Sequence, residues 1–127
     1  MNKKEVNQYS PLTLAFLGDA VYELRVRERI VSGANMPVGK LHKEAVKRVR
    51  AEYQAKAVEL IAPMLTEEEA AVLKRGRNAC PNTVPKNADL AEYRRATALE
   101  TLFGYLYLLE ENERIAELFE YIWEGDF

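Results

Sequence analysis

Apolar residues recur along this chain at the three- and four-residue spacing of α-helices, and no segment alternates in the manner of a β-strand. Residues 76–87 interrupt the pattern with two prolines and three asparagines, which predicts a loop. The periodic segments predict helices at residues 11–32, 39–62, 67–75, 89–109 and 113–123. We therefore expect an all-α fold, a single helical bundle of about five or more helices.

Several predicted helix ends carry capping residues. Ser10-Pro11 is a good helix start, because the Ser side chain accepts from free backbone N–H groups and Pro suits the first helical position. Thr66 and Glu69 form a capping box, in which each side chain accepts from the other residue's backbone N–H. The ends predicted from Gly or Pro lie at Gly33, Pro63 and Gly76.

The first predicted helix carries one carboxylate in an apolar segment. Residues 12–22 are apolar on nearly every side, which predicts a central, buried helix. Asp19 is the only residue from Pro11 to Tyr22 whose side chain is charged at neutral pH. A carboxylate in such surroundings lowers stability unless its charge is compensated.

The helix predicted at residues 89–109 repeats this arrangement. From position 96 onwards, Glu100 is its only residue whose side chain is charged at neutral pH. A narrow polar stripe runs along it at helical spacing, through Thr97, Glu100, Thr101 and Gly104. Gly18 beside Asp19, and Gly104 beside Glu100, would let another backbone or a substrate approach closely.

Two isolated carboxylates on two central helices indicate a site for a hard cation. Mg²⁺ prefers oxygen ligands, keeps several waters and needs only one or two protein carboxylates. The alternative is structural, with each acid paired to an arginine or capped by a hydroxyl inside the bundle. Helical periodicity alone favours this structural alternative, because buried ion pairs occupy such positions too.

The charge is unevenly distributed along the chain. The net charge is −2 and the pI about 5.6, which taken alone argues against binding nucleic acid by bulk attraction. Residues 40–56 and 74–95 are nevertheless rich in Lys and Arg, whereas residues 110–127 are strongly acidic. This pattern predicts one basic face, with an acidic region elsewhere.

Neither a disulfide nor a membrane segment is indicated. The single cysteine, Cys80, has no second cysteine to pair with and no nearby histidine to activate it. The N-terminal segment lacks the features of a signal peptide, and no apolar run reaches the roughly 18 residues of a membrane span. We expect a cytoplasmic protein with no membrane partner.

Two residue strings resemble a known family. Phe16-Leu17-Gly18-Asp19-Ala20-Val21 resembles the F-L-G-D-A-V core of the ribonuclease III signature, and residues 98–107 resemble that family's later F-E-A-L-I-G-A-I-Y helix. The whole chain is similar to the short, Mini-ribonuclease III form of the family. Its further matching pieces are Ser10-Pro11-Leu12, Lys40-Leu41-His42, Arg75 to Ala79, Val84-Pro85-Lys86 and Tyr93-Arg94.

The resemblance implies a magnesium-dependent endoribonuclease that cuts double-stranded RNA as a homodimer and leaves 5′-phosphate and 3′-hydroxyl ends. Asp19 and Glu100 match two metal-binding acids of the family and are our catalytic and metal candidates. Glu23 and Thr97 are outer candidates that could orient water at the metal, although we favour Glu23 as a solvated partner of Arg27. Other acids of the longer enzymes are absent here, which leaves the number of metal ions open; the residues in their places are Leu12, Ala15 and Thr97.

Double-stranded RNA offers phosphates and 2′-hydroxyls, so clustered basic and polar residues are the expected contacts. The RNA-binding candidates are Lys40, His42, Lys43, Lys47, Arg75, Arg77, Asn78 and Lys86. Residues 1–127 are interpreted as one catalytic domain, with no separate double-stranded-RNA-binding domain. By resemblance, the expected substrate is the precursor of large-subunit (23S) ribosomal RNA, with a ribosomal protein considered as a helper.

Two other classes of function compete with this interpretation. One is a non-catalytic RNA-binding module in which both acids are structural. The other is an all-α nucleotide pyrophosphohydrolase, which would draw its metal ligands from Glu-x-x-Glu turns. The available turns, Glu110/Glu113 and Glu117/Glu120, lie outside the apolar setting of Asp19 and Glu100, so we interpret them as surface charge.

Overall fold

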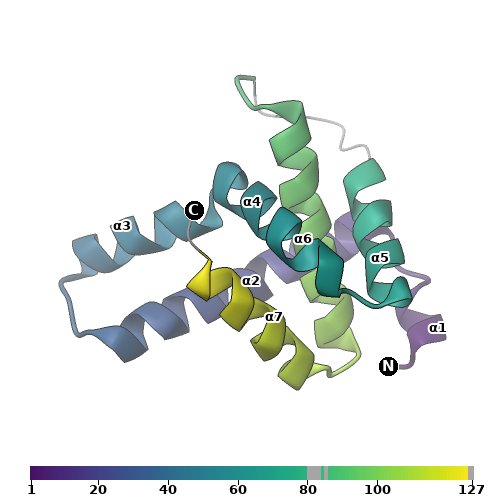
Figure 1. Ribbon diagram of the computed structural model, residues 1–127, viewed down its shortest axis with the longest axis horizontal. Helices are drawn as coiled ribbons and strands as arrows, with labels where there is room; N and C mark the ends of the chain where they lie inside the picture. The colour runs from purple at the N-terminus through teal and green to yellow at the C-terminus, as the bar shows by residue number, and fades with distance from the viewer. Residues whose placement is uncertain (80–83, 85, 126–127) are drawn as a thin grey trace.

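The computed structural model describes residues 1–79, 84 and 86–125, and within them it contains helices and no strand (Figure 1). This confirms the all-α prediction. The α-helices are α1 (Lys3–Val6), α2 (Pro11–Gly33), α3 (Val38–Val49), α4 (Ala51–Ile61), α5 (Glu67–Asn78), α6 (Leu90–Leu108) and α7 (Asn112–Glu124), with a 3₁₀ turn, η1, at Ala62–Met64.

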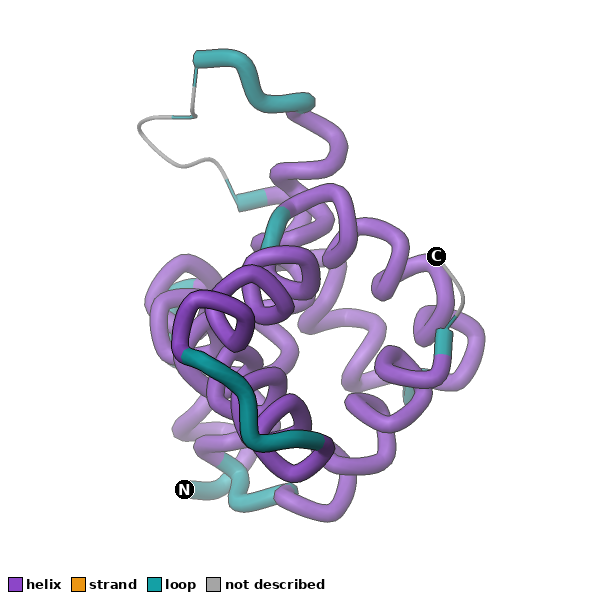
Figure 2. The backbone as a smooth tube through the Cα atoms, turned by 90° about the vertical axis from the view of Figure 1, so that its left-hand side faces the viewer, coloured by secondary structure: helices purple, strands orange, loops and turns teal. Residues whose placement is uncertain are grey.

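The bundle is built around α6. Helices α2, α4 and α5 pack on it from different sides, and α7 covers α4 and α6. Helix α3 folds back along α2, so that these two helices form an arm at the left of Figure 1. The view in Figure 2, turned by 90°, shows that short connections join the helices along most of the chain. None of the described helices is both long enough and apolar enough to cross a membrane.

Helices α2 and α6 cross with their backbones in contact. A Cβ on Gly18 would overlap the carbonyl oxygen of Glu100, and one on Gly104 would overlap the carbonyl oxygen of Leu14. Only glycine permits this approach, because any side chain would push the two helices apart. The close approach predicted from the two glycines is therefore a contact between these two helices.

The prediction of one continuous helix at residues 39–62 is wrong, because the structure has two helices there. It breaks at Arg50, whose backbone is extended (φ −73°, ψ 153°), so α3 packs along α2 while α4 turns onto α6. The Tyr22 hydroxyl donates to the Arg48 carbonyl at 2.8 Å, and this carbonyl would bind the residue 52 N–H in a continuous helix. No Gly or Pro stands at the break, so the local sequence gives no signal for it.

Gly76 does not end its helix. Helix α5 continues to Asn78, and a Cβ on Gly76 would lie 2.5 Å from the Thr101 hydroxyl oxygen of α6. The glycine therefore serves helix packing and not helix termination. The capping box of Thr66 and Glu69 is present as predicted, with N···O distances of 2.9 and 3.1 Å.

The prediction that the first half of α2 is buried on nearly every side is also wrong. Leu14, Gly18 and Tyr22 face the core, but Asp19 is exposed and Phe16 retains 85% of its accessible surface. The apolar residues of α2 thus lie on two faces of the helix, and other described residues of the chain cover only one of these faces. Helix α1, which the apolar pattern did not predict, is held by a capping box between Asn2 and Glu5.

We predict that Gly18→Ala and Gly104→Ala each lower the free energy of unfolding by about 3 kcal/mol or more, because overpacking must separate two backbones. Gly33→Ala is the control, since a Cβ there meets nothing within 4 Å, and it should stay within about 1 kcal/mol of the parent chain. Urea unfolding followed by circular dichroism measures both effects. Equal stability of all three variants would contradict the crossing described above.

Candidate active site

The α2–α6 crossing brings the Asp19 and Glu100 side chains together. Asp19 follows Gly18, and Gly18 lies directly against the backbone of Glu100. The pKa of Glu100 is raised to about 9, first by burial and then by a hydrogen bond and charge repulsion from Asp19. Two carboxyl groups that are 81 positions apart in the chain therefore share one small region of the surface.

Neither carboxylate is compensated by a basic side chain. Among the described residues, no lysine, arginine or histidine forms an ion pair with Asp19 or Glu100. Two facing acids repel each other when both are ionised, and burial strengthens the repulsion. The nearby Thr97 and Thr101 hydroxyls donate to backbone carbonyls instead. This geometry disfavours the structural alternative, in which each acid would be paired with an arginine or capped by a hydroxyl.

The donor set fits a hard divalent cation. Within residues 1–79, 84 and 86–125, no three His, Cys, Asp or Glu side chains cluster as a complete protein cage for a metal. Mg²⁺ suits such a pair, because it keeps several waters and takes one or two carboxylates. A divalent charge between the two acids would also remove the repulsion that raises the pKa of Glu100.

Comparisons with known proteins identify the family. The ribonuclease III domain family matches residues 12–111. The chain belongs to the ribonuclease III family. It is 49% identical over 120 residues to the Mini-ribonuclease 3 of Thermoanaerobacter sp. (strain X514), covering 94% of this chain and 84% of that protein. It is 47% identical over 122 residues to the Mini-ribonuclease 3 of Brevibacillus brevis, covering 93% and 91% of the two chains.

A solved structure agrees with this assignment. The crystal structure of protein FN1578 from Fusobacterium nucleatum superposes with a TM-score of 0.85 at 36% identity, and the match covers 93% of this chain and 96% of that one. The predicted ribonuclease III-type fold is thus confirmed. The chain is an endoribonuclease of the ribonuclease III type, a family that acts on double-stranded RNA and is generally metal-dependent.

The outer candidates of this ribonuclease III site lie on α2 and α6. Glu23 forms an ion pair with Arg27 at 3.5 Å, which is the partner favoured from the sequence. The Thr97 hydroxyl donates to the Tyr93 carbonyl at 3.0 Å, one turn earlier on α6. That proton is therefore used within the helix, and only the oxygen lone pairs of Thr97 could serve water at a metal. A catalytic role for either residue stays a prediction.

The RNA-binding candidates form two groups. Four lie exposed on α3, where Lys47 also pairs with Glu44 at 3.2 Å: Lys40, His42, Lys43 and Lys47. The other group surrounds the end of α5, where Arg77, Asn78 and Lys86 are exposed. Arg75 is partly buried and donates to the Asn7 side chain and the Tyr9 carbonyl at 3.4 and 3.3 Å. Arg75 therefore ties the N-terminal segment to α5, whatever it contributes to RNA binding.

Sequence reasoning missed the exposed apolar side of α2. Phe16, one turn before Asp19, is the most exposed large apolar side chain among the described residues. Leu24 and Val31 are also exposed, at 65% and 63%. The signal was present, because a helix that is apolar on nearly every side needs more than one covering partner.

We predict that the metal-free chain loses stability as the pH rises from about 5 to about 9. The folded Glu100 holds its proton up to about pH 9, whereas an unfolded glutamate releases it near 4.5, so the folded state binds more protons between these values. Thermal unfolding in a chelator should show the midpoint falling over this range. Glu100→Gln should flatten that dependence and melt above the parent chain at pH 8; parallel curves would be evidence against the facing carboxylates.

Proposed function

We propose that this ribonuclease III is a Mg²⁺-dependent enzyme that cleaves double-stranded RNA in the precursor of large-subunit (23S) ribosomal RNA. The products carry 5′-phosphate and 3′-hydroxyl ends. The observation that carries this proposal is the meeting of the Asp19 and Glu100 carboxylates, without a basic partner among the described residues, at a rigid helix crossing. We propose that the enzyme acts in the cytoplasm.

Asp19 and Glu100 would hold the cation from two helices. Mg²⁺, when bound, lowers the pKa of a water and offsets the charge that develops on the scissile phosphate. The backbone contact beneath both acids limits their movement, so the ligands stay placed before the substrate arrives. Because a bound ion would activate the water, neither Asp19 nor Glu100 would have to act as a general base.

Phosphate contacts would supply most of the RNA affinity. The exposed basic residues of α3, together with Arg77, Asn78 and Lys86, offer donors on two parts of the surface. A second copy of the chain or a ribosomal protein could add further affinity. The ribosomal RNA precursor enters the proposal through the similarity to Mini-ribonuclease 3 proteins.

The exposed face of α2 supports a homodimer. Phe16 and Leu24 leave apolar surface exposed along one helix, and such surface marks association sites. A two-fold pairing through this face would bury the same patch on both copies. Asp19 lies one turn from Phe16, so the pairing would bring two active sites close together, one for each RNA strand.

The pyrophosphohydrolase alternative is excluded by the family assignment. One of the two Glu-x-x-Glu turns that it required is engaged at the surface, where Glu117 pairs with Arg114 and Glu120 pairs with Arg29. The same assignment argues against the non-catalytic module. That module differs from our proposal in predicting no magnesium-dependent cleavage of any structured RNA.

We predict that Asp19→Asn and Glu100→Gln each reduce cleavage by about 10³-fold or more, because loss of the metal removes several kcal/mol of transition-state stabilisation. The assay incubates the protein with ribosomal RNA precursor and with a plain RNA duplex, with and without Mg²⁺, and maps the new 5′ ends. Glu113→Gln on α7 is the matched control and should cut normally. Retained turnover in either active-site variant would refute the assignment of these ligands.

We predict that Phe16→Glu converts a dimer into a monomer, because a charge replaces the most exposed apolar side chain of the proposed interface. Sedimentation velocity measures the change, and circular dichroism should show unaltered helix content. Tyr121→Glu on α7 is the control, since Tyr121 is also exposed (51%) but lies on another helix. If the Phe16 variant sediments like the parent chain, α2 is not the interface.

A further inference from the structure

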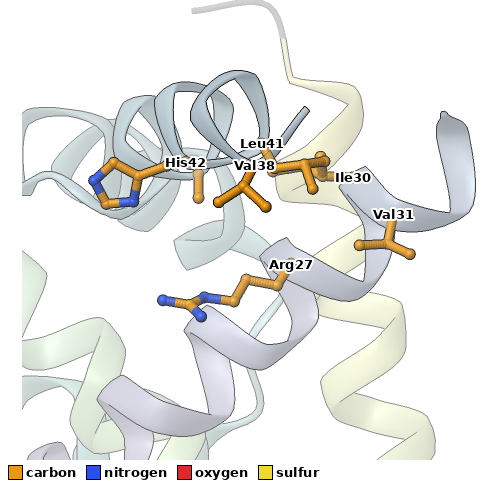
Figure 3. Close-up of a pocket in the computed structure, with 7 residues that line it drawn as sticks. Arg27, Ile30, Val31, Val38, Leu41 and His42 are labelled. Carbon is orange, nitrogen blue, oxygen red and sulfur yellow. The ribbon is translucent and has the colours of Figure 1, made fainter. Parts of the chain in front are cut away.

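A groove of about 260 Å³ opens between the second half of α2 and α3. Its walls are apolar and include Ile30, Leu41 and Ala45. Two of its lining residues, Arg27 from α2 and His42 from α3, carry nitrogen donors. Figure 3 shows the guanidinium and the imidazole at the same end of this groove, with Val31 at the opposite end.

The two donors at this end are weakly engaged. Arg27 has one ion-pair partner among the described residues, Glu23 at 3.5 Å, and both side chains are well exposed, at 61% and 40%. An exposed pair at this distance contributes little, so Arg27 can exchange it for a stronger acceptor. His42 is exposed and makes no hydrogen bond or ion pair with another described residue.

Arg27 lies on the side of α2 that leads from the active site. Asp19, Glu23 and Arg27 follow one another at four-residue spacing, so they form one row along the helix. The eight residues from Asp19 to Arg27 span about 12 Å. Helical side chains lean towards the N-terminus, which directs the guanidinium back towards Asp19.

We infer that Arg27 and His42 together bind one backbone phosphate of the RNA, close to the phosphate that is cut but distinct from it. The inference rests on the proposed function and adds a second anchoring point to it. An arginine fork and an imidazole N–H converging on one opening suit a phosphate, which offers several acceptor oxygens. Lys40 and Lys43, exposed on the same helix as His42, add positive charge beside it.

The apolar walls of the groove fit this occupant. A ribose presents carbon as well as hydroxyl groups, so the sugar next to the bound phosphate can pack on Ile30 and Leu41. Arg27 lies about 12 Å along α2 from Asp19, so a phosphate fixed on it would set which bond of the strand lies over Asp19 and Glu100. Arg27 and His42 are thus binding residues that select the cleavage position.

The first test measures binding in the Glu100→Gln background, which prevents cutting. Arg27→Gln and His42→Gln should each weaken the binding of a short RNA duplex about tenfold, and Arg27→Gln should reduce the salt dependence by about one phosphate contact. Arg25→Gln is the matched control, because it removes the same charge two positions away on a different side of α2. Its affinity and salt dependence should stay at the parent values.

The second test replaces single phosphates of the duplex with neutral methylphosphonates. One substitution near the cut should weaken the parent protein about tenfold and have no further effect on Arg27→Gln, since both changes remove the same contact. Additive losses at every position would overturn the inference, as would parent-like binding by Arg27→Gln. If Arg27→Gln changed the oligomeric state of the protein without changing its RNA affinity, the inference would also be overturned, because a second copy would then be the occupant of the groove.

The two proposals can fail separately. If the parent chain cuts duplex RNA with Mg²⁺ while Arg27→Gln binds and cuts like it at the same positions, the phosphate site is refuted and the nuclease stands. If the parent chain neither binds nor cuts any duplex, the proposed function is refuted, and the phosphate site with it.

Discussion

The backbone contact at Gly18 and Gly104 fixes how α2 crosses α6, and both the core and the candidate metal site depend on this crossing. Two helices that touch at their backbones bring the neighbouring side chains closer than ordinary packing at 8–10 Å between helix axes would allow. Asp19 and Glu100 flank this contact, so the geometry of the candidate metal site is a property of the main chain. A site fixed in this way cannot be loosened without disturbing the core, because the same crossing holds α2 against α6.

The neighbours of two glutamates, Glu69 and Glu100, shift their pKa values in opposite directions. Burial alone would raise the pKa of Glu69, but two hydrogen bonds from Arg114, at 2.8 and 2.9 Å, and those from Thr66 hold it below its usual range. Glu100 faces a second acid instead, and its pKa rises to about 9. Glu69 is thus a structural acid, whereas Glu100 has a second acid beside it and no basic partner among the described residues.

The sequence predicted those features that depend on neighbouring residues and missed those that depend on distant ones. The capping box at residues 66–69 is local chemistry, and it is present as expected. The break at Arg50 depends on where α3 and α4 find partners, and Gly76 serves a contact with α6, so neither follows from local propensity. Two isolated acids and a family resemblance predict the meeting of Asp19 with Glu100, whereas the exposure of Phe16 depends on how the helices pack and is seen only in the structure.

Helix α2 explains why that exposure was hard to foresee. Its buried row, which includes Leu14, Gly18 and Tyr22, recurs every four residues and packs on α6. Phe16 and Asp19 lie on the remaining surface, and so does Arg27, which gives one helix an apolar patch, an acid and a base. A helix that only packed on the core would have polar residues over the whole of its outer surface. Some apolar residues of α2 therefore pack in the core, and others form a surface for a binding partner. Periodicity cannot separate the two sets, because both consist of the same residue types.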